Sequence, residues 1–322
     1  MGAMSHVPSH NGLNSLVGLW KIKQQIMRSV NSAKLRNAQL GHCLLTGLGG
    51  CGKTSIGRCI AQMMNSRFYE TEAADIRNRQ NIISWILDCS SKSETFVLFV
   101  DEIHRLSHEA QEAFYYPMTD RVVNKDGVKI SINPFTLIGA TTRRDMLDQG
   151  SFVTRFQNIW DVGRYSLPDM ETIVYNECVK HGLRCSPVVC HFIASRCIGI
   201  PRAAVSLVAK IRDQVLFDHP NSLIITEKDV HTICNLEEID SIGLNKGHVL
   251  YLRALAQSPQ HPKGLSVLSA LLGQARSVVE SSIEPVLLSL GFITATPRGR
   301  MLTERGHKHL NFSEKKLDKI TD

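Results

Sequence analysis

The sequence predicts an α/β fold in which a parallel sheet carries helices on both faces, followed by a small helical lid domain and a C-terminal winged-helix domain. Three observations predict it. Strand and helix signals alternate from Gly41 to about Tyr165, as in doubly wound sheets. Helical signals with little strand follow from Pro168 to about Glu238. Further helical stretches and two short strands, joined by a basic turn, complete the chain.

A glycine-rich loop follows the first predicted strand, His42 to Thr46, and precedes a helical stretch, Ser55 to Met64. Its string GLGGCGKT has the spacing of a P-loop, in which successive backbone N–H groups and a helix N-terminus surround phosphates. Lys53 is expected to reach the terminal phosphates of ATP and Thr54 to hold Mg²⁺. The residues predicted to bind the nucleotide here are Gly47, Gly49, Gly50, Cys51, Gly52, Lys53, Thr54 and Ser55.

An acidic pair, Asp101 and Glu102, ends the apolar strand Phe96 to Val100. Carboxylates at the C-terminal end of an interior parallel strand lie where such sheets bind ligands. Asp101 is expected to position Mg²⁺ and Glu102 to orient or deprotonate the attacking water. An acidic pair alone is as often a helix N-cap. Its order and distance relative to the glycine-rich loop favour ATP hydrolysis.

A third apolar strand, Pro134 to Ala140, delivers polar residues, Thr141 to Arg144, toward the same edge, where they can sense the γ-phosphate. Before it, Asp126-Gly127 separates two β-like runs and predicts a hairpin within Asp120 to Asn133. This hairpin is either a protruding contact or a solvated surface turn.

Composition indicates a folded protein of the cytoplasm. The 322 residues include nine cysteines without a CxxC pair, which makes a disulfide framework or a zinc site unpersuasive. Cys190, His191 and Cys197 lie at helical spacing in an apolar segment and are interpreted as core residues rather than metal ligands. No stretch is apolar enough to span a membrane, and Met1 to Asn11 is excluded from the fold prediction.

Positive charge is concentrated toward the C-terminus. The net charge is +7, and the segment from Lys246 onward contains eleven basic and six acidic residues. Strands joined by a basic turn at Pro297 to Arg300 follow helices there, which is typical of a winged helix. Such a domain binds either DNA or protein, and the positive charge permits binding to nucleic acid.

From about Leu16 to Leu310 the chain resembles the RuvB family, the AAA+ motors of bacterial Holliday-junction branch migration. The strings that carry this resemblance are VDEIHRLS, PFTLIGATTR, TRF at Thr154 to Phe156, GIPRAA at Gly199 to Ala204, and IEPVLLSLGFITATPRGR. We expect an ATPase domain at 12–166, a helical lid at 167–242, a winged helix at 243–312 and a basic tail at 313–322.

The resemblance implies roles for residues that spacing alone does not assign. Thr142 matches the sensor-1 position and Arg155 the arginine finger, which acts on the neighbouring subunit of a homo-oligomer, expected to be a hexameric ring. Arg202 matches sensor 2, on the lid. Arg298 and Arg300 match the wing arginines that contact DNA.

The sequence also departs from the family pattern. The middle of the phosphate loop, Leu48 to Cys51, is unusual, and the family's arginine-proline segment before Leu16 is missing. One residue is inserted between Thr142 and Arg155. The hairpin that the family uses to dock RuvA is shorter here and has a polar tip, Asn124 to Asp126, which argues against dependence on RuvA.

The leading hypothesis is an ATP-driven, ring-forming DNA translocase that migrates four-way junctions in recombination and repair. A nucleotide-switched DNA-binding adaptor or loader without sustained translocation is the alternative. A protein-remodelling ATPase is a third, weaker possibility.

Overall fold

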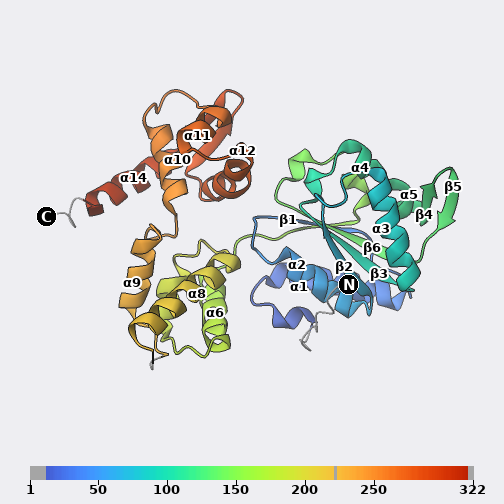
Figure 1. The fold of residues 1–322 in the computed structure, drawn as a ribbon, viewed down its shortest axis with the longest axis horizontal. Helices are drawn as coiled ribbons and strands as arrows, with labels where there is room; N and C mark the ends of the chain where they lie inside the picture. Colours follow the sequence, from blue (N-terminus) through green and yellow to red (C-terminus); the bar gives the residue numbers. More distant parts are fainter. Residues whose placement is uncertain (1–11, 221–222, 318–322) are drawn as a thin grey trace. The chain divides into compact units, whose positions relative to one another are not determined.

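The computed structural model describes residues 12–220 and 223–317. They form two compact units: the first contains the segment ending at Gly47 and Cys51–Gly163, and the second contains Leu48–Gly50 and the chain from Arg164 onward. Figure 1 shows the sheet in the first unit and mainly helices in the second. Met1 to Asn11 lies outside the described residues, and the domain bounds given above stay a prediction.

The first unit is built on a five-stranded parallel sheet, as predicted. Its strands run in the order β2-β3-β6-β1-β7. The three inner strands are mostly buried along their length, whereas the edge strand β2 is polar and partly exposed. Their bounds are β1 Cys43–Thr46, β2 Arg67–Glu72, β3 Phe96–Asp101, β6 Phe135–Thr141 and β7 Asn158–Asp161.

Helices cover both faces of this sheet, with α1 and α2 on one side and α3 on the other in Figure 1. Short helices and 3₁₀ turns fill the connections. The helices are α1 Trp20–Leu35, α2 Lys53–Met63, α3 Arg79–Lys92, α4 His108–Glu112 and α5 Tyr115–Asp120, and the 3₁₀ turns are Gly12–Ser15, Ile103–Arg105, Arg144–Met146 and Val153–Arg155.

The predicted hairpin is confirmed as an antiparallel pair, β4 Val122–Lys125 and β5 Val128–Ser131. Asp126 and Gly127 form its two-residue turn with φ values of 50° and 82°. Aspartate followed by glycine suits a turn that needs two positive φ values and matches the twist of the strands.

Strand order brings the predicted site together. β6 lies between β1, which leads into the glycine-rich loop, and β3, which ends in the acidic pair. Because all five strands are parallel, their carboxyl ends share one edge of the sheet, where such folds bind ligands.

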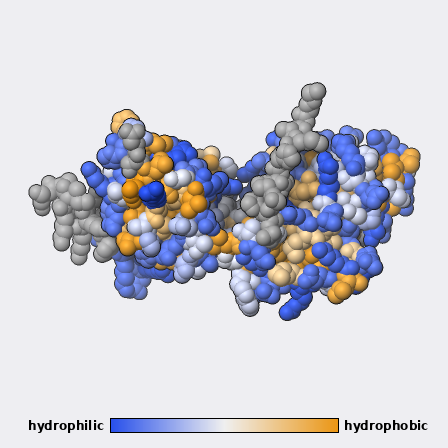
Figure 2. Space-filling model, turned by 90° about the horizontal axis from the view of Figure 1, so that it is seen from below, coloured by the Kyte–Doolittle hydropathy of each residue, from blue (hydrophilic) through white to orange (hydrophobic). Residues whose placement is uncertain are grey.

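The lid portion of the second unit contains four helices, α6 Leu167–Lys180, α7 Pro187–Ala194, α8 Pro201–Asp218 and α9 Glu227–Leu236. Cys190 and Cys197 lie in its hydrophobic core, which bears out their interpretation as core residues. The same interpretation is wrong for His191, which lies on the exposed face of α7 and contacts Glu171 Oε1 through Nδ1 at 2.6 Å. Hydrophobic residues also gather on the face of this unit seen in Figure 2. The large apolar side chains exposed on the lid include Val179, Val188, Phe217, Leu223 and Ile224.

The rest of this unit is a winged helix, as predicted. An isolated antiparallel β-bridge joins the backbone of Lys263 to that of Arg300, beside the two wing strands. α14 extends past position 312, the predicted domain end, and the predicted tail lies partly outside the described residues. The elements are α10 Lys246–Ala256, α11 Leu265–Leu272, α12 Arg276–Val278, a π-helical turn Val279–Ile283, α13 Glu284–Ser289, β8 Ile293–Thr296, β9 Gly299–Leu302 and α14 Glu304–Leu317.

No helix within the described ranges combines the length and hydrophobicity that crossing a bilayer requires.

Candidate active site

The glycine-rich loop is anchored to the sheet at its first residue. Gly47 N–H donates to the carbonyl of Thr141 over 3.2 Å. At Gly47 φ is +136°, and a Cβ there would lie 2.1 Å from the carbonyl oxygen of Val162, so only glycine fits. Gly52, with φ +89°, directly precedes Lys53, the first residue of α2. The loop therefore ends at a helix N-terminus, where backbone N–H groups favour an anion.

The first turn of α2 contains Lys53, Thr54 and Ser55. Lys53 is 6% exposed, and its Nζ donates to the carbonyl of Gly47 over 2.9 Å. The ammonium thus lies at the loop that it is predicted to serve. Cys51 is fully buried, so its thiol is shielded from solvent.

Two oxygen groups at this edge fit Mg²⁺. The Thr54 hydroxyl belongs to the first turn of α2, and the Asp101 carboxylate ends β3. Asp101 Oδ1 accepts the N–H of Glu102 over 2.9 Å, which orients the carboxylate. Hydroxyl and carboxylate oxygens are ligands that this hard cation prefers.

Glu102 is held in a defined position immediately after β3. Its backbone is left-handed, with φ 47°, a conformation that is uncommon outside glycine and asparagine. The hydroxyl of Thr142 donates to Glu102 Oε2 over 3.1 Å. The structure therefore joins the predicted water-activating carboxylate to the predicted sensor threonine.

His104 is a residue of this site that the sequence analysis did not single out. Its Nδ1 lies 3.1 Å from Glu102 Oε2 and 3.0 Å from Thr141 Oγ1, and its side chain is 8% exposed. Burial lowers the pKa of His104, and the neighbouring Glu102 carboxylate partly opposes that change. The available signal was its place two residues after Glu102 in the string VDEIH.

Arg155 lies in a 3₁₀ turn and faces α5. Its Nη1 donates to the carbonyl of Ser151 over 2.6 Å, and its guanidinium carbon lies 4.0 Å from the centre of the Tyr115 ring. Its Nε is buried and has no hydrogen-bond partner among the described residues. These contacts place Arg155 against α5, whereas Thr142 and His104 surround Glu102.

Arg202 contacts the glycine-rich loop through its backbone, within the second unit. It occupies the first turn of α8, and its N–H donates to the carbonyl of Gly50 over 3.2 Å. A Cβ on Gly50 would lie 2.6 Å from Arg202 Cβ. The absence of a side chain at Gly50 thus allows the close approach of α8 to the loop.

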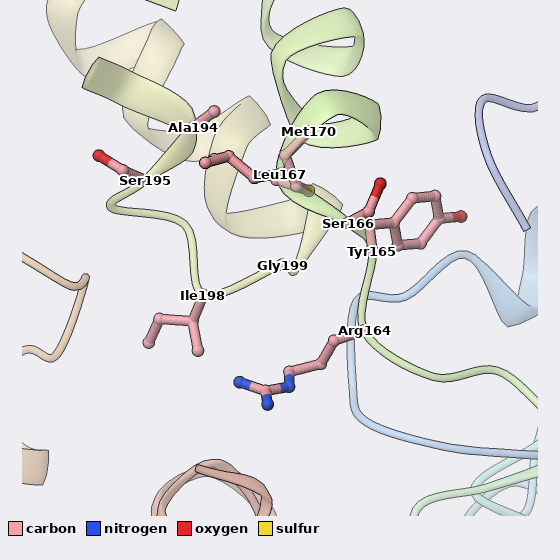
Figure 3. Close-up of a pocket in the computed structure, with 9 residues that line it drawn as sticks. All are labelled: Arg164, Tyr165, Ser166, Leu167, Met170, Ala194, Ser195, Ile198 and Gly199. Atoms are coloured by element: carbon pink, nitrogen blue, oxygen red, sulfur yellow. The ribbon is translucent and has the colours of Figure 1, made fainter. Parts of the chain in front are cut away.

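A pocket of about 540 Å³ opens in the second unit near the start of α6. Figure 3 shows the side chains of Arg164 and Ile198 extending away from those of Leu167 and Met170. The lining mixes apolar and polar groups, as in pockets that bind small organic molecules. It is formed by Arg164, Tyr165, Ser166, Leu167, Met170, Ala194, Ser195, Ile198 and Gly199.

The two wing arginines have different environments. Arg298 is exposed in the turn between β8 and β9. Arg300 forms a bidentate pair with Glu284, donating from Nε over 2.7 Å and from Nη2 over 3.0 Å, and Tyr251 donates to the same carboxylate over 2.5 Å. Arg300 therefore holds β9 against α13 through its guanidinium, and the predicted DNA contact rests on Arg298.

The fold and the site define a P-loop ATP hydrolase that carries a lid and a winged helix. Residues 9–161 match the Holliday junction DNA helicase RuvB P-loop domain, and residues 241–311 match the RuvB C-terminal winged helix domain. The chain belongs to the RuvB family.

Individual relatives agree with this family. A Holliday junction branch migration complex subunit RuvB from Pseudothermotoga lettingae is 32% identical, covering 94% of this chain and 89% of the relative. The subunit from Synechococcus sp. is 34% identical, covering 93% of this chain and 85% of the relative. The Thermotoga maritima RuvB Holliday junction branch migration motor has a TM-score of 0.84 and 29% identity, covering 94% of this chain and 97% of that one.

Proposed function

We propose that this protein is a ring-forming DNA translocase that uses ATP hydrolysis to migrate Holliday junctions. The observation that carries the proposal is the occurrence, in one chain, of a glycine-rich loop and an acidic strand end at one edge of a parallel sheet and of a winged helix with an exposed basic turn. The relatives named as branch migration subunits support this assignment.

ATP and Mg²⁺ are the proposed cofactors. Bound Mg²⁺ supplies positive charge to the phosphates, and Thr54 and Asp101 are the residues that would hold it. Lys53 binds the terminal phosphates, and Glu102 orients or deprotonates water.

Ring formation is proposed from Arg155 and from the lid surface. An arginine finger acts on a neighbouring subunit, so hydrolysis requires at least a subunit pair and, by family likeness, a hexamer. The apolar side chains exposed on the lid, such as Phe217 at 82%, are typical of surfaces that contact another protein.

The winged helix is proposed to bind duplex DNA without sequence preference. We expect Arg298→Ala to weaken binding to all sequences and to reduce the salt dependence by about one ion, because one phosphate contact is lost. Arg300→Ala instead leaves the Glu284 carboxylate, 6% exposed, without its cation. The free energy of unfolding should then fall by about 2–3 kcal/mol.

Fluorescence anisotropy at several salt concentrations and urea unfolding separate these two effects. An unchanged salt slope in the Arg298 variant would contradict its contact with phosphate. Wild-type stability of the Arg300 variant would contradict the structural role of its ion pair.

The hairpin β4–β5 is the surface on which a RuvA-like partner would dock. Its tip residues Asn124, Lys125 and Asp126 are exposed and polar, although Val128 in β5 is 61% exposed. We propose that junction migration does not depend on a RuvA-like protein docking on this tip.

The test is ATP-dependent dissociation of a synthetic four-way junction by the purified protein, alone and with RuvA, with Glu102→Gln as control. We expect the unmodified protein to dissociate the junction equally well with and without RuvA, and the Glu102→Gln variant not to dissociate it. Stimulation by RuvA would show that the hairpin retains its docking role.

The polar hairpin tip also favours the second candidate, a nucleotide-switched DNA-binding adaptor or loader. For a motor, Glu102→Gln should stop movement while ATP and DNA remain bound. For a switch, the same variant should keep its ATP-dependent recruitment of a partner. ATP-dependent DNA binding without junction dissociation in any sample would favour the adaptor.

A further inference from the structure

We propose that His104 is a positioning residue for ATP hydrolysis, which holds one oxygen of Glu102 so that the other is directed at the attacking water. This inference rests on the role proposed for Glu102. Two side chains converge on Glu102 Oε2: the Thr142 hydroxyl at 3.1 Å and His104 Nδ1 at 3.1 Å. With Oε2 engaged by both, Oε1 is the oxygen left for water.

The position of His104 is set by the packing of its own turn. The turn Ile103–Arg105 follows Glu102 directly, and Arg105 N–H donates to the Glu102 carbonyl over 2.8 Å. Ile103 is fully buried against Gly139 of β6, where a Cβ would come within 2.8 Å of Ile103 Cδ1. Because Gly139 has no side chain, Ile103 can pack closely against β6. This packing fixes the position of the turn and places the His104 imidazole next to Glu102.

The chemistry of the contact assigns the hydrogen of His104. An ionised carboxylate only accepts hydrogen bonds, so Nδ1 can bind Glu102 Oε2 only when it carries the hydrogen, which it then shares with Thr141 Oγ1, its hydrogen-bond partner at 3.0 Å. Thr141 Oγ1 also accepts the N–H of Arg143 over 2.9 Å. Burial keeps the imidazole neutral by lowering its pKa. A neutral donor orients Glu102 without cancelling the negative charge that the base needs.

The two partners of Glu102 differ in what they can sense. Thr142 is partly exposed beyond the end of β6, at the edge where the nucleotide is expected. His104 is buried, lies against Glu102 and Thr141, and is assigned no contact with the nucleotide. Its effect on the reaction must therefore pass through Glu102, and this makes the proposal testable by combining substitutions.

The experiment measures steady-state ATPase kinetics of His104→Ala and His104→Asn, each in the native background and combined with Glu102→Gln. In the native background, His104→Ala should lower kcat about tenfold to a hundredfold, with KM for ATP unchanged, because the base is misplaced. His104→Asn, whose amide can donate from the position of Nδ1, should recover much of the loss. With Glu102→Gln present, His104→Ala should change the residual rate by less than about twofold.

Equal loss in both backgrounds would overturn the inference, since His104 would then act independently of Glu102. A wild-type rate for His104→Ala, beside a strong loss for Glu102→Gln, would overturn it while leaving the proposed function intact. A wild-type rate for Glu102→Gln would instead overturn the proposed role of Glu102 itself. Thermal unfolding and nucleotide binding of both His104 variants are measured in parallel. If His104→Asn is stable and binds ATP but shows no recovery, the hydrogen-bonding role is rejected.

Discussion

Replacing Arg155 by alanine should lower the ATPase rate by about a thousandfold or more while leaving the affinity for ATP unchanged. The guanidinium is expected to stabilise charge that develops on the phosphates of the neighbouring subunit only in the transition state. In the structure Arg155 rests on the Tyr115 ring and on the Ser151 carbonyl, and its Nε has no partner among the described residues. Arg155 is half-buried rather than enclosed, so part of its side chain is accessible to a second subunit.

Mixed assemblies give the sharpest measurement. Arg155→Ala subunits retain intact loops, and Lys53→Ala subunits retain their fingers, so a mixture should recover ATPase activity that neither variant has alone. Arg67→Ala serves as a matched control, because Arg67 is exposed at the N-terminal end of β2, at the opposite edge of the sheet. Undiminished activity of Arg155→Ala, or no recovery on mixing although both variants assemble, would reject the finger role.

Replacing Glu102 by glutamine should lower the hydrolysis rate by about a hundredfold to ten-thousandfold and leave ATP bound. An amide has nearly the shape of a carboxylate and can still accept the Thr142 hydroxyl, but it is far too weak a base to accept a proton from water. The variant should therefore remain on DNA with ATP.

Phosphate release and calorimetric titration with ATP check this expectation. Glu109→Gln is a suitable control, because Glu109 is exposed in α4 and its substitution removes the same charge nearby. Loss of ATP binding in Glu102→Gln would show that the carboxylate supports the nucleotide site itself rather than the reaction.

The parts of the fold that were predicted correctly depend on local patterns. The strand before Gly47 and the apolar strand ending at Asp101 were recognised because strands buried on both faces are continuous apolar runs. The hairpin was predicted because Asp126-Gly127 suits a turn that other residue pairs adopt at a cost. The placement of the glycine-rich loop and the acidic pair at one edge of the sheet followed from the rule that parallel strands share a carboxyl edge.

The role of Arg300 could not be predicted in the same way. Arg298 and Arg300 are two positions apart in one basic turn, and the sequence treats them alike. Glu284, 16 residues earlier in α13, is brought to Arg300 only when the wing folds back on that helix. A buried carboxylate needs a cation, and Arg300 is the one that the fold supplies.

By itself the sequence determined the local features on which the proposed chemistry rests: a glycine-rich loop, an acidic strand end and a basic winged helix. These properties are local, because residue type and spacing along the chain specify them. Only the tertiary structure decided which side chains meet. The hydroxyl of Thr142, 40 residues further along the chain, reaches Glu102 Oε2, and Arg300 turns inward while Arg298 remains exposed. Such contacts depend on packing between segments distant in sequence, which no local pattern records.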